Sequence, residues 1–74
     1  MTSAEIKGIL LENNVNFKKL FEKHQNYERR LDQLNKRPFL SASEEREKLE
    51  IKKQKLSLKD KMQIHIEKYR EENS

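Results

Sequence analysis

Apolar side chains recur along residues 17–34 at alternating intervals of three and four. The stripe consists of Phe17, Leu20, His24, Tyr27, Leu31 and Leu34. This is the a/d pattern of a coiled coil, in which a repeat of about 3.5 residues keeps one seam facing a partner helix. It predicts a helix over residues 15–36 that ends before Pro38, because the residue before a proline is displaced from the helical region.

A second long helix is expected after residues 37–41, which form a turn. Ser41 and Glu44 have the spacing of a capping box, and the acidic residues that follow complement the positive end of the helix dipole. We expect this helix over residues 42–70, with a frayed tail over residues 71–74. Because the turn is short, the two helices should be antiparallel neighbours.

The two arms of this hairpin should pair about the turn. Equal rise along both arms places Leu20 opposite Leu58. It also places Tyr27 opposite Ile51, so apolar residues meet apolar residues. The predicted hairpin interface consists of Phe17, Leu20, His24, Tyr27, Leu31, Ile51, Lys55, Leu58 and Met62.

One polar residue, His24, interrupts the apolar stripe and should face Gln54 and Lys55. A single polar residue at an a position fixes the register and the choice of partner helix. The alternative is a pH-sensitive switch, since a nearby lysine favours neutral imidazole. We favour the structural interpretation.

A short helix is predicted over residues 3–13, capped by Thr2 or Ser3. The pair Asn13–Asn14 is expected to end it, because asparagine tolerates the left-handed conformation found at helix ends. Its apolar residues should cover the far end of the long helix. The residues in this predicted contact are Ile6, Ile9, Leu10, Ile66 and Tyr69.

The 74 residues are expected to form one all-α domain, residues 1–74. The apolar fraction of 32% and the charged fraction of 41% would be typical of disorder if the apolar residues were not ordered on stripes. The chain has no cysteine, which excludes disulfides and fits a reducing compartment. Because small domains have thin cores, oligomerisation is the remaining route to stability.

A second apolar row runs along the helix expected over residues 42–70 and consists of Leu49, Leu56 and Ile64. At about 100° per residue these positions lie opposite the hairpin face. An exposed apolar row on a small protein often marks an association surface. We therefore predict a homo-oligomer, a dimer or higher, joined along this row. The alternative is three scattered surface side chains, which are common in soluble proteins.

A lysine-rich stretch suggests an alternative hypothesis, in which the chain is a weak nucleic-acid-associated accessory protein. The lysines are Lys52, Lys53, Lys55, Lys59 and Lys61. They could contact phosphates, but the aromatic residues are used in the predicted core and leave no stacking platform. The net charge of +4 is a mild bias. We favour a solvated helix face, and an interaction module whose protein partner the sequence does not identify.

Motifs for chemistry are absent from the sequence, which has no phosphate-binding glycine loop, nucleophile elbow or zinc-protease helix. Two facing helices are expected to leave no concave pocket. His24 and His65 should lie far apart, so no metal site is expected. We therefore expect no enzyme activity and no cofactor.

No run of the sequence approaches the roughly 20 apolar residues that span a bilayer. The first residues also lack the pattern of a signal peptide. We expect a cytoplasmic protein with no membrane partner.

Two blocks of the sequence carry a resemblance to a known family, and the second is the more specific. Residues 17–24 read FKKLFEKH, and residues 49–62 read LEIKKQKLSLKDKM. Both blocks resemble the YdcH-like family of short bacterial proteins, a domain of unknown function. The resemblance implies a helical hairpin in a bacterial cytoplasm and supplies no activity, so no catalytic residue is carried over. His24 and Lys55 match its polar positions, whereas Tyr27 stands where a leucine is more usual.

Overall fold

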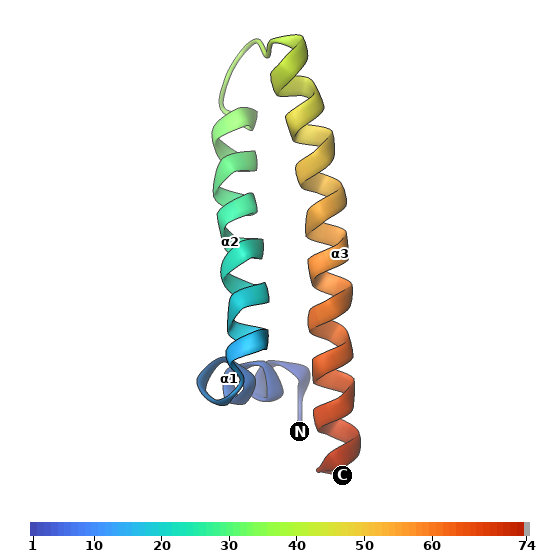
Figure 1. Ribbon diagram of the computed structural model, residues 1–74. Coiled ribbons are helices and arrows are strands. Elements are labelled where there is room, and N and C mark those ends of the chain that lie inside the picture. The colour runs from blue at the N-terminus through green and yellow to red at the C-terminus, as the bar shows by residue number, and fades with distance from the viewer. Residues whose placement is uncertain (74) are drawn as a thin grey trace.

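Three helices make up the computed structural model, which describes residues 1–73. They are α1 (Ser3–Asn13), α2 (Val15–Asn35) and α3 (Ala42–Glu72). The helices α2 and α3 run antiparallel as a hairpin, and α1 lies across the open end of the hairpin, near both termini (Figure 1). The molecule measures 49 × 20 × 16 Å. The predicted all-α hairpin with a short N-terminal helix is confirmed.

Each helix begins at a side chain that accepts a hydrogen bond from a free backbone N–H group. The Thr2 hydroxyl accepts from the N–H of Glu5 at 3.2 Å. At α3, the Ser41 hydroxyl accepts from the Glu44 N–H, and the Glu44 carboxylate accepts from the Ser41 N–H. Such contacts satisfy N–H groups that have no partner within the helix. The predicted capping box is therefore present.

Asn14 joins α1 to α2 and serves both helices at once. Its backbone N–H donates to the Leu10 carbonyl at 2.8 Å, which closes the last turn of α1. Its side-chain oxygen accepts from the Phe17 N–H at 3.0 Å, which caps α2. The predicted left-handed conformation is wrong, because Asn14 is extended with φ −125° and ψ 105°. An extended residue can cap the next helix immediately, and this produces the sharp corner between α1 and α2.

The helix ends differ slightly from the predicted ones. Helix α2 ends at Asn35 rather than at Lys36. Helix α3 continues to Glu72, so the expected fraying from residue 71 does not occur at residues 71–72. Residue 74 lies outside the described residues. The Asn73 N–H donates to the Tyr69 carbonyl and extends the helical hydrogen-bond pattern by one residue.

The core is concentrated where the three helices meet. Phe17 and Ile6 are fully buried there, and Leu10, Met62 and Ile66 pack with them. The prediction that α1 covers the far end of α3 is therefore confirmed for Ile6 and Leu10, whereas Ile9 is half-buried and outside this cluster. This corner explains how a short helix outside the hairpin is held in place.

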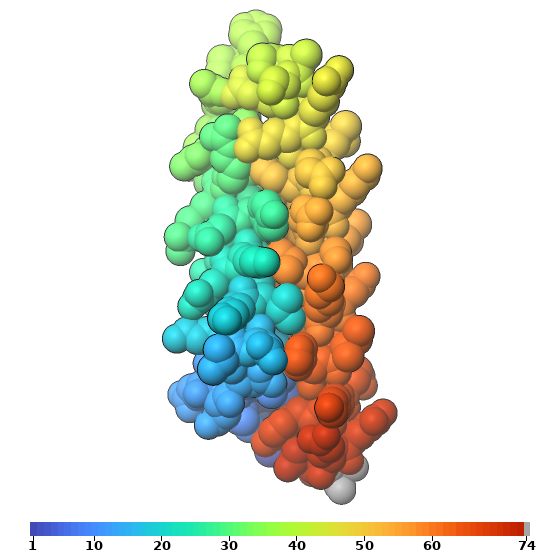
Figure 2. Space-filling view, in the orientation of Figure 1, coloured from blue at the N-terminus to red at the C-terminus, as the bar shows by residue number. Residues whose placement is uncertain are grey.

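The rest of the hairpin has a thinner seam. Ile51 and Leu58 of α3 and Leu34 of α2 are buried. Side chains fill the space between the two ribbons over most of their length (Figure 2). Among the described helices, none is long and apolar enough to cross a membrane.

Candidate functional site

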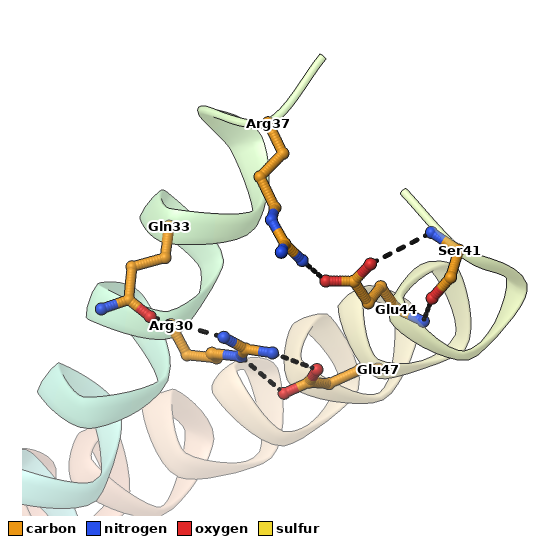
Figure 3. A network of polar contacts seen from close by, with 6 residues as sticks. All are labelled: Arg30, Gln33, Arg37, Ser41, Glu44 and Glu47. Carbon is orange, nitrogen blue, oxygen red and sulfur yellow. Dashed lines mark hydrogen bonds and ion pairs between the residues drawn. The ribbon is translucent and has the colours of Figure 1, made fainter. Parts of the chain in front are cut away.

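Two ion pairs reach α3 near the turn, one from α2 and one from the turn itself (Figure 3). Arg30 donates from Nε and a terminal nitrogen to the two carboxylate oxygens of Glu47, at 2.8 and 2.9 Å. Arg37 forms an ion pair with Glu44, whose carboxylate also accepts from the Ser41 backbone. A bidentate pair restricts both position and orientation. These contacts therefore fix the register of the hairpin near its turn.

The pairing between Arg30 and Glu47 shifts the pKa of both groups. The hydrogen bonds from Arg30 lower the pKa of Glu47 below its ordinary value, and those to Glu47 raise the pKa of Arg30. Both side chains are about two-fifths exposed, at 42% and 40%. Water therefore screens the pair, and its main effect is on geometry.

Neither of these two ion pairs was predicted from the sequence. The acidic residues that follow Ser41 were interpreted only as complementing the helix dipole. The signal was present, because Arg30 and Glu47 lie almost opposite each other in the pairing that matches Leu20 with Leu58.

The predicted hairpin interface is buried to different extents. Its members Phe17, Ile51, Leu58 and Met62 are buried, whereas Leu20, His24, Tyr27, Leu31 and Lys55 are half-buried. The ring of Phe17 meets the ring of His65 edge-on, with centroids 6.0 Å apart and planes at 82°. The seam therefore closes at the α1 end and remains partly open in the middle.

At the middle of the seam, a carboxylate separates the predicted polar pair. Glu28 Oε1 lies 3.9 Å from His24 Nδ1 and 3.4 Å from Lys55 Nζ. A carboxylate that the sequence interpretation did not include therefore lies within ion-pair distance of both groups. The His24 side chain is 18% exposed and lines the adjacent groove.

A groove of about 600 Å³ runs along one side of the hairpin. Its lining combines apolar side chains with four lysines, and consists of Lys7, Phe17, Phe21, His24, Glu28, Leu31, Lys52, Lys55, Leu56, Lys59, Met62, Gln63 and Ile66. The prediction that two facing helices leave no concave pocket is therefore wrong. Phe21, His24 and Leu31, which line it, are half-buried.

The five lysines of the nucleic-acid alternative do not share one surface. Lys52, Lys55 and Lys59 line the groove, whereas Lys53 and Lys61 do not. Lys55 is engaged with Glu28. The basic stretch of the sequence thus divides between the groove and other sides of α3.

The predicted apolar row of α3 lies on the surface of the isolated chain. Leu49, Leu56 and Ile64 are 62%, 64% and 66% exposed. We call these three residues the outer row. Leu56 also touches the edge of the groove, so it stands between the two surfaces.

Within residues 1–73, no three histidine, aspartate or glutamate side chains gather in a group that could hold a metal ion.

A family model described as "Protein of unknown function (DUF465)" matches residues 17–65, which is well over half of the chain. The match agrees with the resemblance to the YdcH-like family. No curated protein and no solved structure gives a significant match to the chain.

Proposed function

This chain belongs to the DUF465 family, whose function is unknown, and on that premise we propose that it is a helical interaction module without catalysis. Its first partner is a second copy of the chain. The two copies associate in antiparallel orientation through the outer row of α3, which Leu49, Leu56 and Ile64 form.

The exposure of the outer row supports this proposal. Its three side chains are each more than three-fifths exposed, on a molecule with a thin core of its own. Burying an exposed leucine or isoleucine contributes about 1.5–3 kcal/mol. A contact that covers all three in both copies therefore supplies apolar burial that the monomer lacks.

The positions around the row are complementary to themselves in an antiparallel dimer. With a two-fold axis near Leu56 and Ser57, residues at equal distances on either side of the axis meet their counterparts in the second copy. Leu49 then lies opposite Ile64 of the second copy. At about 100° per residue these positions share one side of α3.

The charges beside the row follow the same symmetry. An axis near Leu56 brings Lys53 opposite Asp60 of the second copy. Farther out, it brings Arg46 opposite Glu67. All four are exposed. A parallel arrangement would instead place each charged residue beside the same residue of the second copy, and like charges would repel. This charge pattern is the observation that carries the antiparallel dimer.

Sedimentation equilibrium across about 10–500 µM tests the proposal. We expect a monomer–dimer equilibrium for the native chain and a monomer for the double variant Leu49→Gln/Ile64→Gln. The control is Phe39→Gln, because Phe39 is 89% exposed and lies in the turn, away from the outer row. Circular dichroism checks that each variant is folded. A native chain that is monomeric throughout, or a Phe39 variant that dissociates equally, contradicts the proposal.

The resemblance to short bacterial proteins and the lack of cysteine favour a bacterial cytoplasm as the location of this module. Fractionation of the source cells followed by immunoblotting tests this: recovery in the soluble cytoplasmic fraction supports the location, and recovery elsewhere contradicts it.

A further inference from the structure

We propose that the groove between α2 and α3 binds an acidic amphipathic helix of a partner protein, which lies along the hairpin as a third long helix. This site adjoins the surface proposed for the self-association of α3. Leu56 lies at the border of both surfaces, but the groove depends on its other lining residues, whereas self-association depends also on Leu49 and Ile64, which do not line the groove.

The groove has the length of a helical ligand. Its lining runs from Phe17 to Leu31 on α2 and from Lys52 to Ile66 on α3. At a rise of about 1.5 Å per residue, each wall spans roughly 21 Å, or about four turns of a helix. A bound helix of about 14 residues would cover the open middle of the seam.

The floor of the groove is an incomplete core. Phe21 and Leu31 are half-buried, although both belong to apolar positions of α2 that point toward the hairpin. Met62 and Ile66 complete the floor from α3. Leucines at positions i, i+3, i+4 and i+7 of a bound helix would bury these side chains, as in other helix-in-groove complexes.

The charge at the edges selects an acidic helix. Lys52 and Lys59 are exposed, and neither has a carboxylate within ion-pair distance among residues 1–73. Lys7 of α1 supplies a third ammonium group. The carboxylate of Glu28 is already shared between Lys55 and His24. Glutamates on the flanks of a bound helix would pair with the three lysines at the edge of the groove.

Nucleic acid is disfavoured by the same geometry. Of the two phenylalanine rings that line the groove, that of Phe17 is fully buried, and Lys7 Nζ lies 4.9 Å from the ring centroid of Phe21. The ammonium group thus covers a ring face on which a base would stack. The apolar side chains of the groove can pack against leucines but provide no hydrogen-bond donors to a phosphate backbone.

The test uses a designed, fluorescein-labelled peptide of about 18 residues with leucines on one face and glutamates on its flanks. Fluorescence anisotropy measures its Kd for the full chain at low and high salt. A second peptide with lysine in place of each glutamate controls for apolar stickiness. We expect the acidic peptide to bind at least tenfold more tightly than the basic one, and more weakly at high salt.

Charge reversal locates the binding site. The variant Lys52→Glu/Lys59→Glu should raise the Kd at least tenfold. Its matched control, Lys18→Glu/Lys61→Glu, changes the net charge equally at exposed lysines outside the groove lining and should change the Kd less than twofold. Equal effects in the two variants, equal binding of the two peptides, or no binding would overturn the proposal.

Two further readouts decide between occupants. In NMR spectra, bound acidic peptide should shift the side-chain resonances of Phe21, Leu31 and Met62 and leave those of Leu49 and Ile64 unchanged. Shifts confined to Leu49 and Ile64 would overturn the proposal. A labelled single-stranded or duplex oligonucleotide that binds more tightly than the peptide, with the same sensitivity to Lys52→Glu/Lys59→Glu, would also overturn it in favour of nucleic acid.

Discussion

Phe17 packs edge-on against His65, with ring centroids 6.0 Å apart, at the corner where α1, α2 and α3 meet. Phe17 is the largest fully buried side chain among the described residues. Its backbone N–H is also the donor that Asn14 caps. One residue therefore connects the turn between α1 and α2 to the C-terminal half of α3.

The first prediction concerns this corner. Phe17→Ala should lower the free energy of unfolding by about 3–5 kcal/mol, because it removes a fully buried ring and leaves a cavity. Urea denaturation followed by circular dichroism measures the change. Phe39→Ala removes an equal side chain that is 89% exposed and should leave stability almost unchanged. Similar losses in both variants would show that the corner is not the core.

The second prediction concerns the double role of Asn14. Asn14→Ala should cost about 1 kcal/mol, because it removes the side-chain acceptor that caps α2. Asn14→Asp keeps an acceptor oxygen and should retain most of the stability. The comparison uses the same urea titration. An aspartate variant as unstable as the alanine variant would rule out capping as the reason.

The third prediction concerns Gly8, which lies within α1. A Cβ atom added there would meet nothing within 4 Å, and the residue has no positive φ. Gly8→Ala should therefore raise the free energy of unfolding by about 0.5–1 kcal/mol through helix propensity. Thermal unfolding measures the gain. A lower Tm for this variant would contradict the position assigned to α1.

The fourth prediction is a dependence of stability on pH. Hydrogen bonds from Arg30 lower the pKa of Glu47 in the folded chain. The stability that this pair contributes is present above the pKa of Glu47 in the unfolded chain. It is lost as the pH falls through the lower folded-state pKa. The Tm of the native chain should therefore fall in the acid range below the ordinary pKa of glutamate.

The variant Glu47→Gln isolates this contribution. It should have a lower Tm than the native chain near neutral pH and a smaller difference from it in acid. Glu22→Gln is the control, because Glu22 is exposed and has no ion-pair partner among residues 1–73. If the difference in Tm between the native and Glu47→Gln chains were the same at every pH, the Arg30–Glu47 pair would not be the source of the pH dependence.

The hairpin was predictable because two strong local signals agree. The stripe that begins at Phe17 requires a facing helix, and the Ser41 capping box starts that helix within a few residues. The placement of Ile6 against Ile66 was also predictable, since α3 outlasts α2 and leaves apolar positions uncovered. For the hairpin, a periodic pattern and a capping motif agree. For the placement of α1, the greater length of α3 decides the arrangement.

The groove was not predictable in the same way. Whether Leu31 and Phe21 are buried depends on the relative rotation of two helices, and a pattern of apolar positions does not fix that rotation. The carboxylate of Glu28 between His24 and Lys55 has the same origin, because it lies one turn beyond the polar position that was considered. The pairing of Arg30 with Glu47 does not follow from the apolar pattern, because it depends on charges at opposite positions on the two arms of the hairpin.

The orientation of two copies along α3 tests the central claim most directly. Because the chain has no cysteine, a nitroxide label at Glu45→Cys reports one distance between copies by double electron–electron resonance. An antiparallel dimer with its axis near Leu56 predicts about 35–40 Å, from a rise of about 1.5 Å per residue. A distance of about 10–20 Å, which a parallel dimer would give, or no dipolar signal between copies at high concentration, would contradict the account.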